Sequence, residues 1–144
     1  MAEPATRRDP SPLEAALERV GDRWSLLLVE ALLDGPRRFN ELGDVVTGIA
    51  PNILSDRLRR LERGRIVVAT PYQDRPQRLS YALTADGRDL ASALRLLADW
   101  GARGGTDAEP IRHGTCGTPL ETRWFCPTCE IAVDDPDADE SRNL

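Results

Sequence analysis

Apolar residues recur every three to four positions along the first half of the chain, which is the spacing of amphipathic helices. In the first run Leu13, Leu17 and Val20 fall on one face, and Gly21 ends it. Asp22 is placed to cap a second helix directly afterwards. The same spacing predicts further helices at about residues 23–33, 40–47 and 51–63.

Two β-rich runs follow, IVVATPY at 66–72 and RLSYALT at 78–84. The loop DRPQ between them predicts a hairpin with an arginine-bearing tip. Thr84 can cap a final long helix that reaches about Trp100. Its apolar stripe consists of Leu90, Leu94 and Leu97. The predicted fold class is therefore mainly α with a small β-hairpin wing (α+β), which is the winged helix-turn-helix layout.

The chain contains 144 residues, enough for one ordinary core and a small appendage. No apolar run approaches the roughly 20 residues that span a bilayer, and the N-terminal MAEPATRRDPSP lacks the apolar stretch of a secretory signal. We therefore expect a cytoplasmic protein with no membrane partner. All 19 Lys and Arg residues are arginine, which is typical of a GC-rich genome.

The net charge of −5 would argue against a nucleic-acid partner if the charges were evenly distributed, but they are not. Residues 1–105 hold 16 arginines against 15 acidic residues, whereas residues 106–144 hold 3 against 9. The stretch 57–78 holds seven arginines against two acidic residues. A basic patch thus lies inside a chain whose acidity is concentrated in the tail, although such a patch alone also fits a solvated helix face.

The helix predicted at 51–63 combines an apolar stripe with a polar face that suits the major groove of DNA. Asn pairs with adenine edges and Arg with guanine edges or phosphates, and recognition helices read bases from their N-terminal residues. We expect Asn52, Ser55 and Arg59 to read bases. The residues expected to hold the backbone are Arg38, Asn40, Arg60, Arg63, Arg75 and Arg78. The candidate DNA-binding residues are Arg38, Asn40, Asn52, Ser55, Asp56, Arg59, Arg60, Arg63, Arg75 and Arg78.

The stretches GDRWSLLLVEALLDGPRRFNEL, PNILSDRLRRLE and RLSYALTADGRDL resemble the HxlR family of bacterial winged-helix transcription regulators, over about residues 11–101. The resemblance implies a homodimer whose first and last helices pack against their symmetry mates and whose two recognition helices meet a palindromic operator. Family members often begin this region with Cys-Pro, and some use that cysteine as a sensor. Ser11-Pro12 stands here instead, which excludes a thiol switch at that site and leaves a small-molecule effector open.

The three cysteines and the only histidine lie in the last third of the chain, as His113-x2-Cys116 and Cys126-x2-Cys129. Two such pairs separated by nine residues are what a tetrahedral zinc site needs, because each pair can chelate from one turn. The Cys3His set favours a structural Zn²⁺ ribbon, which resembles C-terminal extensions of some members of the family. A disulfide, which a cytosolic location disfavours, and a metal or thiol sensor that moves the DNA-binding domain are the alternatives.

The expected organisation is a DNA-binding and dimerisation domain at 11–104, the ribbon at 110–133, and disordered ends at 1–10 and 134–144. Trp24 and Trp100 have helical core spacing, and the dimer interface is the alternative for Trp100. No histidine or cysteine is left for catalysis, so we do not expect an enzyme. The rival function is a winged helix used as a protein-interaction module, but residues 52–63 lack the apolar anchors that docking helices show.

Overall fold

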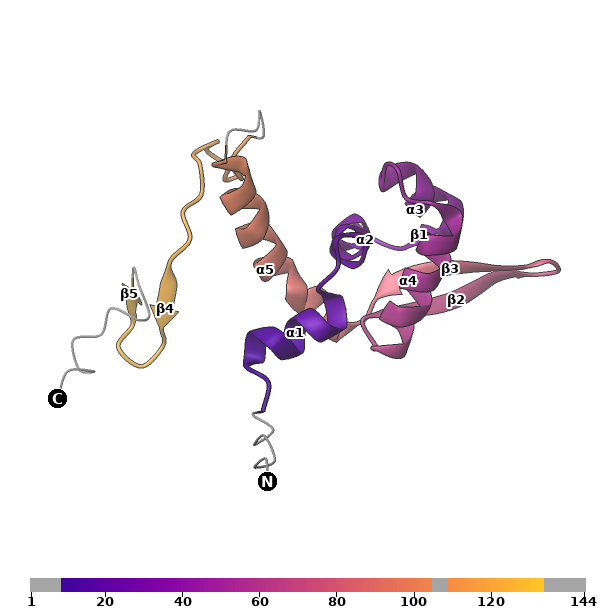
Figure 1. Ribbon diagram of the computed structural model, residues 1–144. Helices are drawn as coiled ribbons and strands as arrows, with labels where there is room; N and C mark the ends of the chain where they lie inside the picture. The colour runs from indigo at the N-terminus through magenta and orange to yellow at the C-terminus, as the bar shows by residue number, and fades with distance from the viewer. Residues whose placement is uncertain (1–8, 105–108, 134–144) are drawn as a thin grey trace, which may run out of the picture. The chain divides into compact units, whose positions relative to one another are not determined.

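The computed structural model describes residues 9–104 and 109–133, so nearly all of the ends expected to be disordered lie outside the described residues. Contacts divide the chain into two compact units, Met1–Leu94 and Arg95–Leu144. The helices are α1 (Pro12–Val20), α2 (Arg23–Leu33), α3 (Phe39–Val45), α4 (Pro51–Arg63) and α5 (Ala85–Ala102), as Figure 1 shows. The strands are β1 (Arg37–Arg38), β2 (Val67–Asp74), β3 (Gln77–Leu83), β4 (Trp124–Cys126) and β5 (Ile131–Val133). Among the described helices, none is both long and apolar enough to cross a bilayer.

The predicted helix caps are confirmed. Asp22 Oδ1 accepts a hydrogen bond from the backbone N–H of Ser25 at 3.0 Å, at the start of α2. Thr84 Oγ1 accepts one from the N–H of Gly87 at 3.1 Å, at the start of α5. Ser11 forms a capping box that starts α1: its N–H donates to the Glu14 side chain at 2.6 Å. The positions of these short polar side chains therefore fix where three of the helices begin.

A three-stranded antiparallel sheet in the order β1-β3-β2 forms the wing. Strand β1 was not predicted; it has two residues, and Arg37 pairs with Tyr81 of β3. Strands β2 and β3 run further than expected and pair as far as Asp74 with Gln77, so the predicted DRPQ loop is a tighter turn. Strand β2 lies at the sheet edge, where Pro71 is tolerated because no ladder hydrogen bond is lost.

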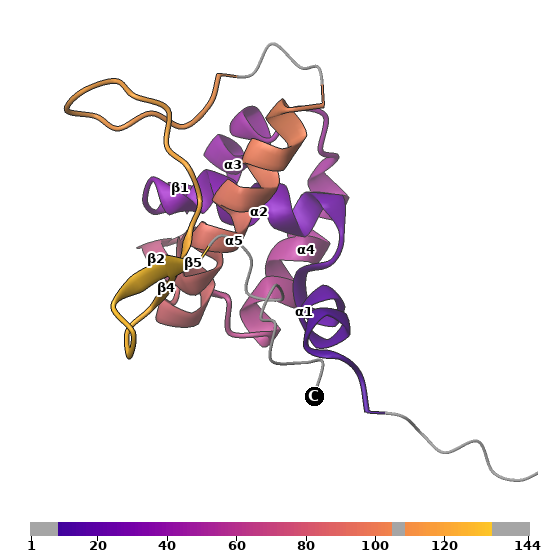
Figure 2. The same ribbon diagram turned by 90° about the vertical axis from the view of Figure 1, so that its left-hand side faces the viewer.

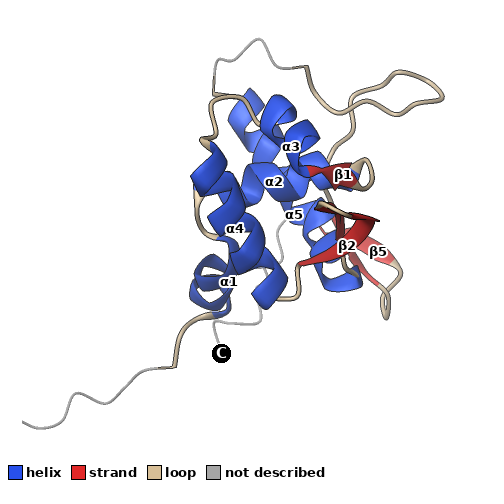
Figure 3. Cartoon of the chain, turned by 90° about the vertical axis from the view of Figure 1, so that its right-hand side faces the viewer, coloured by secondary structure: helices blue, strands red, loops and turns tan. Residues whose placement is uncertain are grey.

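The core of the first unit lies between α2, α3 and α4, which gather beside the sheet in Figure 3. Leu28, Leu42 and Leu61 are fully buried, one from each helix. Each buried leucine stabilises the fold by about 1.5–3 kcal/mol. The predicted stripe of α4 is confirmed, since its other members Leu54 and Leu58 are also buried.

The expected packing of aromatic and α5 residues is only partly confirmed. Trp24, Leu90 and Leu94 are half-buried against the core. Trp100 is instead 67% exposed and Leu97 is 50% exposed. Among the described residues, the α5 stripe is therefore packed against the core of the first unit at Leu90 and Leu94 and exposed at Leu97.

The second unit has little buried surface. Strands β4 and β5 form an antiparallel hairpin, and residues 109–123 form an extended loop before it, as Figure 2 shows. No described residue of Arg95–Leu144 is fully buried. This segment therefore has no apolar core of its own.

Candidate nucleic-acid interface

Helices α3 and α4 form a helix-turn-helix whose second helix presents a polar face to solvent. In the connection, Gly48 adopts φ +84°, a left-handed conformation that favours glycine. The polar face predicted for α4 is confirmed by the burial of its residues: the exposed members are Asn52, Asp56, Arg59 and Arg63, with Ser55 and Arg60 half-buried at its edges. No large apolar side chain of α4 is exposed, so the face suits a polar partner.

Two arginines of α4 contact other helices of the same chain. Asp22, the cap of α2, accepts a hydrogen bond from Arg57 Nε at 3.0 Å. Arg60 lies 3.7 Å from the other carboxylate oxygen of Asp22 and donates to the Glu18 carbonyl at 2.7 Å. These contacts join α4 to the corner between α1 and α2. Sequence reasoning missed Arg57 because its partner lies 35 positions away.

Two further arginines hold the helices to the sheet and to each other. Arg19 of α1 donates to the Gly64 carbonyl at 3.0 Å and pairs with Asp86 of α5. Arg37 of β1 donates to the Ala31 carbonyl of α2 at 2.7 Å. A basic side chain in this chain is therefore not by itself a DNA contact. The structure separates arginines that bond to other groups of the chain from arginines that do not.

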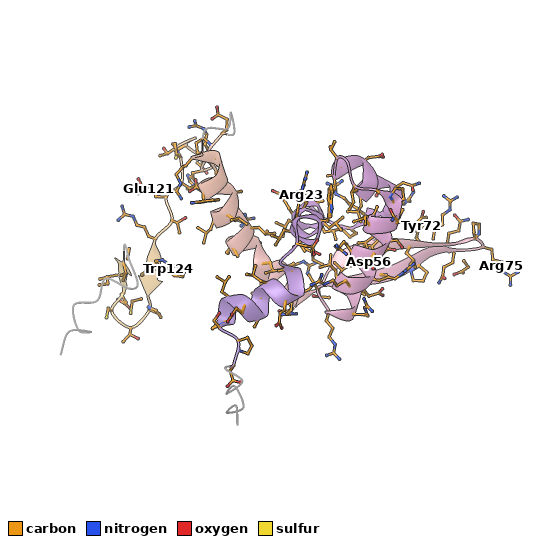
Figure 4. All side chains as sticks on the ribbon, in the orientation of Figure 1. Arg23, Asp56, Tyr72, Arg75, Glu121 and Trp124 are labelled. Carbon is orange, nitrogen blue, oxygen red and sulfur yellow. The ribbon has the colours of Figure 1, made fainter. Side chains whose placement is uncertain are left out.

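Four of the predicted arginines form no side-chain hydrogen bond, ion pair or ring contact within the described residues: Arg59, Arg63, Arg75 and Arg78. All four are exposed. Arg75 lies at the tip of the wing in Figure 4, and its carbonyl accepts a hydrogen bond from Gln73 Nε2 at 3.1 Å. Free cations are thus available both on the outer face of α4 and along the end of the wing.

An open pocket of about 550 Å³ between the start of α3 and the wing is lined by three of the candidate residues, Arg38, Asn40 and Arg78. Tyr72 also lines it and sits at a β-bulge, where the pairing of β2 with β3 skips one residue. The Arg38 guanidinium lies over the Tyr72 ring, 4.4 Å from its centroid. This contact orients the cation without neutralising it. Tyr72 is a site residue that the strand pattern did not reveal, because its partner Arg38 lies on another strand, far away along the chain.

The sequence profile of the HxlR-like helix-turn-helix family matches residues 19–108, which contain α2 to α5 and every candidate DNA-binding residue. The chain belongs to the HxlR-like helix-turn-helix family. It is therefore a transcriptional regulator with a helix-turn-helix DNA-binding domain, and the proteins of this family are regulators rather than enzymes. The family resemblance seen in the sequence is confirmed.

This HxlR-like chain is 40% identical over 118 residues to the HTH-type transcriptional regulator Rv3095 of Mycobacterium tuberculosis, covering 79% of this chain and 74% of that protein. The reduced form of the redox regulator HypR matches with a TM-score of 0.61 and 33% identity, over 65% of this chain and 93% of that one. The Pseudomonas aeruginosa protein PA1374 matches with a TM-score of 0.66 and 31% identity, over 91% of this chain and 97% of that one.

The predicted metal ligands of this HxlR-like regulator lie on two turns beyond the family match. His113 Nδ1 is 3.2 Å from Cys116 Sγ, and all three cysteines are free thiols. Hydrogen bonds with Thr118, and then with His113, lower the pKa of Cys116 to about 7. Cys126 and Cys129 lie at the turn of the β4–β5 hairpin, with their side chains hydrogen-bonded to each other. Within the described residues no three His, Cys, Asp or Glu side chains gather into one metal-binding group. Each predicted ligand pair is therefore formed, but His113 and Cys116 do not meet Cys126 and Cys129 in one site.

Proposed function

We propose that this regulator binds a palindromic operator as a homodimer and reads its bases with the outer face of α4. The observation that carries the proposal is the division of the arginines into two kinds. Arg57 and Arg60 bond to Asp22 on the inner side of α4, whereas Arg59 and Arg63 are exposed and free of ion pairs on the outer side. If the charges of α4 served only to keep it soluble, we would not expect its unpaired cations to be confined to the outer face.

The proposed roles follow from position and from free donors. Asn52, Ser55 and Arg59 would read base edges, because they lie in the first two and a half turns of α4 and carry amide, hydroxyl and guanidinium groups. Asp56 can accept a hydrogen bond from cytosine, although Arg57 already pairs with it. Arg60 can reach a phosphate only by leaving its contacts with α1 and α2, so we assign it the smallest share of binding.

The wing and the pocket beside α3 would hold the sugar–phosphate backbone. Arg38, Asn40 and Arg78 surround the pocket, Arg75 extends from the wing tip, and Arg63 ends the outer face of α4. If Arg38, Arg63, Arg75 and Arg78 each neutralise a phosphate, a dimer neutralises about eight, and the logarithm of affinity falls with the logarithm of salt with a slope of about −7.

The dimer proposal rests on apolar side chains that are exposed in the part of the chain that the structure describes. Helix α1 exposes Leu13 and Leu17, one turn apart. The C-terminal half of α5 exposes Leu96, Leu97 and Trp100. Exposed apolar clusters of this kind mark interaction surfaces. A palindromic operator requires that the two α4 helices of such a dimer lie about one DNA turn apart.

Sedimentation analysis and selection from random DNA test the two parts separately. Trp100→Ala and Leu17→Ser should raise the dimer dissociation constant at least about tenfold, because each buried side chain contributes more than the roughly 1.4 kcal/mol that a factor of ten represents. Val68→Ser, also at an exposed apolar position, is the control and should leave it unchanged. Selected DNA should contain an inverted repeat. A monomeric wild type, or an asymmetric selected site bound by one chain, would refute the proposal.

A further inference from the structure

We propose that His113, Cys116, Cys126 and Cys129 bind one Zn²⁺ ion, and that this metal holds residues 109–133 together. The segment has 25 residues, none of which is buried. Trp124, Phe125 and Ile131 are each more than half exposed. A segment of this size cannot bury enough apolar surface to fold on a core, and small domains use a metal or disulfides instead.

The two ligand pairs lie on turns with the same backbone geometry. The residue after each pair is left-handed, with φ +73° at Gly117 and +56° at Glu130. Its N–H donates to the carbonyl of the first ligand, to His113 at 2.7 Å and to Cys126 at 2.8 Å. Glutamate rarely adopts a left-handed conformation, so this turn forms despite its local sequence preference. Two turns of unrelated sequence thus converge on one shape, in which the first and fourth residues can chelate together.

The first pair already has the spacing of two zinc ligands. His113 Nδ1 and Cys116 Sγ are 3.2 Å apart. Zinc–nitrogen bonds of about 2.0–2.1 Å and zinc–sulfur bonds of about 2.3 Å imply about 3.5 Å between two ligand atoms of a tetrahedron. A movement of a few tenths of an ångström would therefore suffice to chelate the ion.

The four side chains form a ligand set that favours zinc over calcium and magnesium. Three thiolates and one imidazole are soft and borderline ligands, whereas calcium and magnesium require oxygen ligands. Residues 120–123, which connect the first turn to β4, have no regular structure. Binding of the metal supplies the free energy that joins the two ligand pairs, as in other small metal-dependent folds.

Metal analysis of the full-length protein, purified without chelator, tests the stoichiometry. We expect about one zinc per chain in the wild type, and less than about one fifth as much in Cys116→Ser and in Cys129→Ser. Thr128→Ala, within the second turn but without a ligand atom, is the matched control and should keep its zinc. Substituted cobalt(II) should show the strong visible absorption of a tetrahedral thiolate site, and this absorption should weaken in both serine variants.

Limited trypsin digestion is a second, non-spectroscopic test of whether zinc orders this segment. Arg112 and Arg123 flank the first turn, and both are exposed. Zinc should slow cleavage after both residues at least about tenfold, and a chelator should restore it. Less than about half an equivalent of zinc after reconstitution, unchanged cleavage, or a disulfide found between cysteines of the protein as purified would each overturn the proposal. None of these readouts measures DNA binding, so this proposal and the proposed function fail or succeed separately.

Discussion

Replacing Asp22 with alanine removes two kinds of contact at once and tests how the recognition helix is positioned. Its carboxylate caps α2 through Ser25, with the backbone N–H at 3.0 Å and the hydroxyl at 2.6 Å. It also accepts a hydrogen bond from Nε of Arg57, on α4, at 3.0 Å. Only about a quarter of the Asp22 side chain is exposed, and the same holds for Arg57. The residue therefore links the cap of one helix to the inner side of the recognition helix.

The magnitude follows from the two contacts. Loss of an N-cap costs about 1 kcal/mol. Loss of a hydrogen bond to a charged group costs about 1.5 kcal/mol when, as here, both side chains are partly exposed. Asp22→Ala should therefore lower the free energy of unfolding by about 2–3 kcal/mol. Asp22→Asn keeps a capping oxygen and loses the charge, so about 1 kcal/mol is expected.

The pH dependence provides an independent check. Burial alone would raise the pKa of Asp22, but the hydrogen bonds from Ser25 and Arg57 outweigh it and lower the pKa. Because the pKa of Asp22 is lower in the folded state, its ionised carboxylate stabilises the protein at pH values above the ordinary aspartate pKa of about 3.9. This stabilisation is lost as the pH falls through the pKa of the folded state. The difference in stability between wild type and Asp22→Asn should therefore shrink below about pH 4.

Urea denaturation followed by circular dichroism measures these differences, at one fixed protein concentration because the stability of a dimer depends on concentration. Asp44→Ala, an exposed aspartate of α3 with no ion pair in the described part of the chain, is the control. If Asp22→Ala lies within about 0.5 kcal/mol of wild type, or if Asp22→Asn is as destabilised as Asp22→Ala, the reasoning is refuted.

Three other substitutions separate recognition from folding. Arg59→Ala should weaken operator binding by about 1–3 kcal/mol and relax specificity, whereas Arg88→Ala on α5 should change neither; an equal loss on all DNA would make Arg59 a phosphate contact. Tyr72→Leu should weaken binding about two- to fivefold and Tyr72→Phe should not, because only the aromatic ring carries the contact with Arg38; equal losses would exclude that contact. Gly87→Ala should destabilise the fold by about 1–3 kcal/mol in thermal or urea unfolding, since its Cβ would lie 2.2 Å from a backbone carbonyl oxygen. Gly101→Ala, with open space around it, should not destabilise, and a neutral Gly87→Ala would show that the backbone shifts easily there.

The elements that follow from local chemistry were predictable. Leu54, Leu58 and Leu61 identify the buried side of α4 because helical period alone fixes which residues share a face. Asp22 and Thr84 mark helix starts because their side chains satisfy backbone donors only a few residues away. The family resemblance in the sequence rests on such stretches, and the profile match confirms it.

What depends on distant contacts was not predictable. Whether an arginine is free or paired depends on residues far along the chain, so Arg57 was missed and the partners of Arg60 were not foreseen. The contact of Tyr72 with Arg38 depends on how β1, β2 and β3 pair, not on the sequence of one strand. Trp100 has core spacing and is nevertheless exposed, because periodicity does not say which surface will cover a helix face.

The most direct test of the central claim is fluorescence-anisotropy binding to DNA from upstream of the protein's own gene, against scrambled DNA, over a salt series. We expect preference for the upstream fragment, an affinity that falls with salt with a slope of about −7, and a slope shallower by about 2 in Arg63→Ala, which removes one phosphate contact per protomer. Equal and weak binding to both fragments at every salt concentration, unchanged in Arg59→Ala and Arg63→Ala, would contradict the assignment of the outer face of α4 to operator recognition.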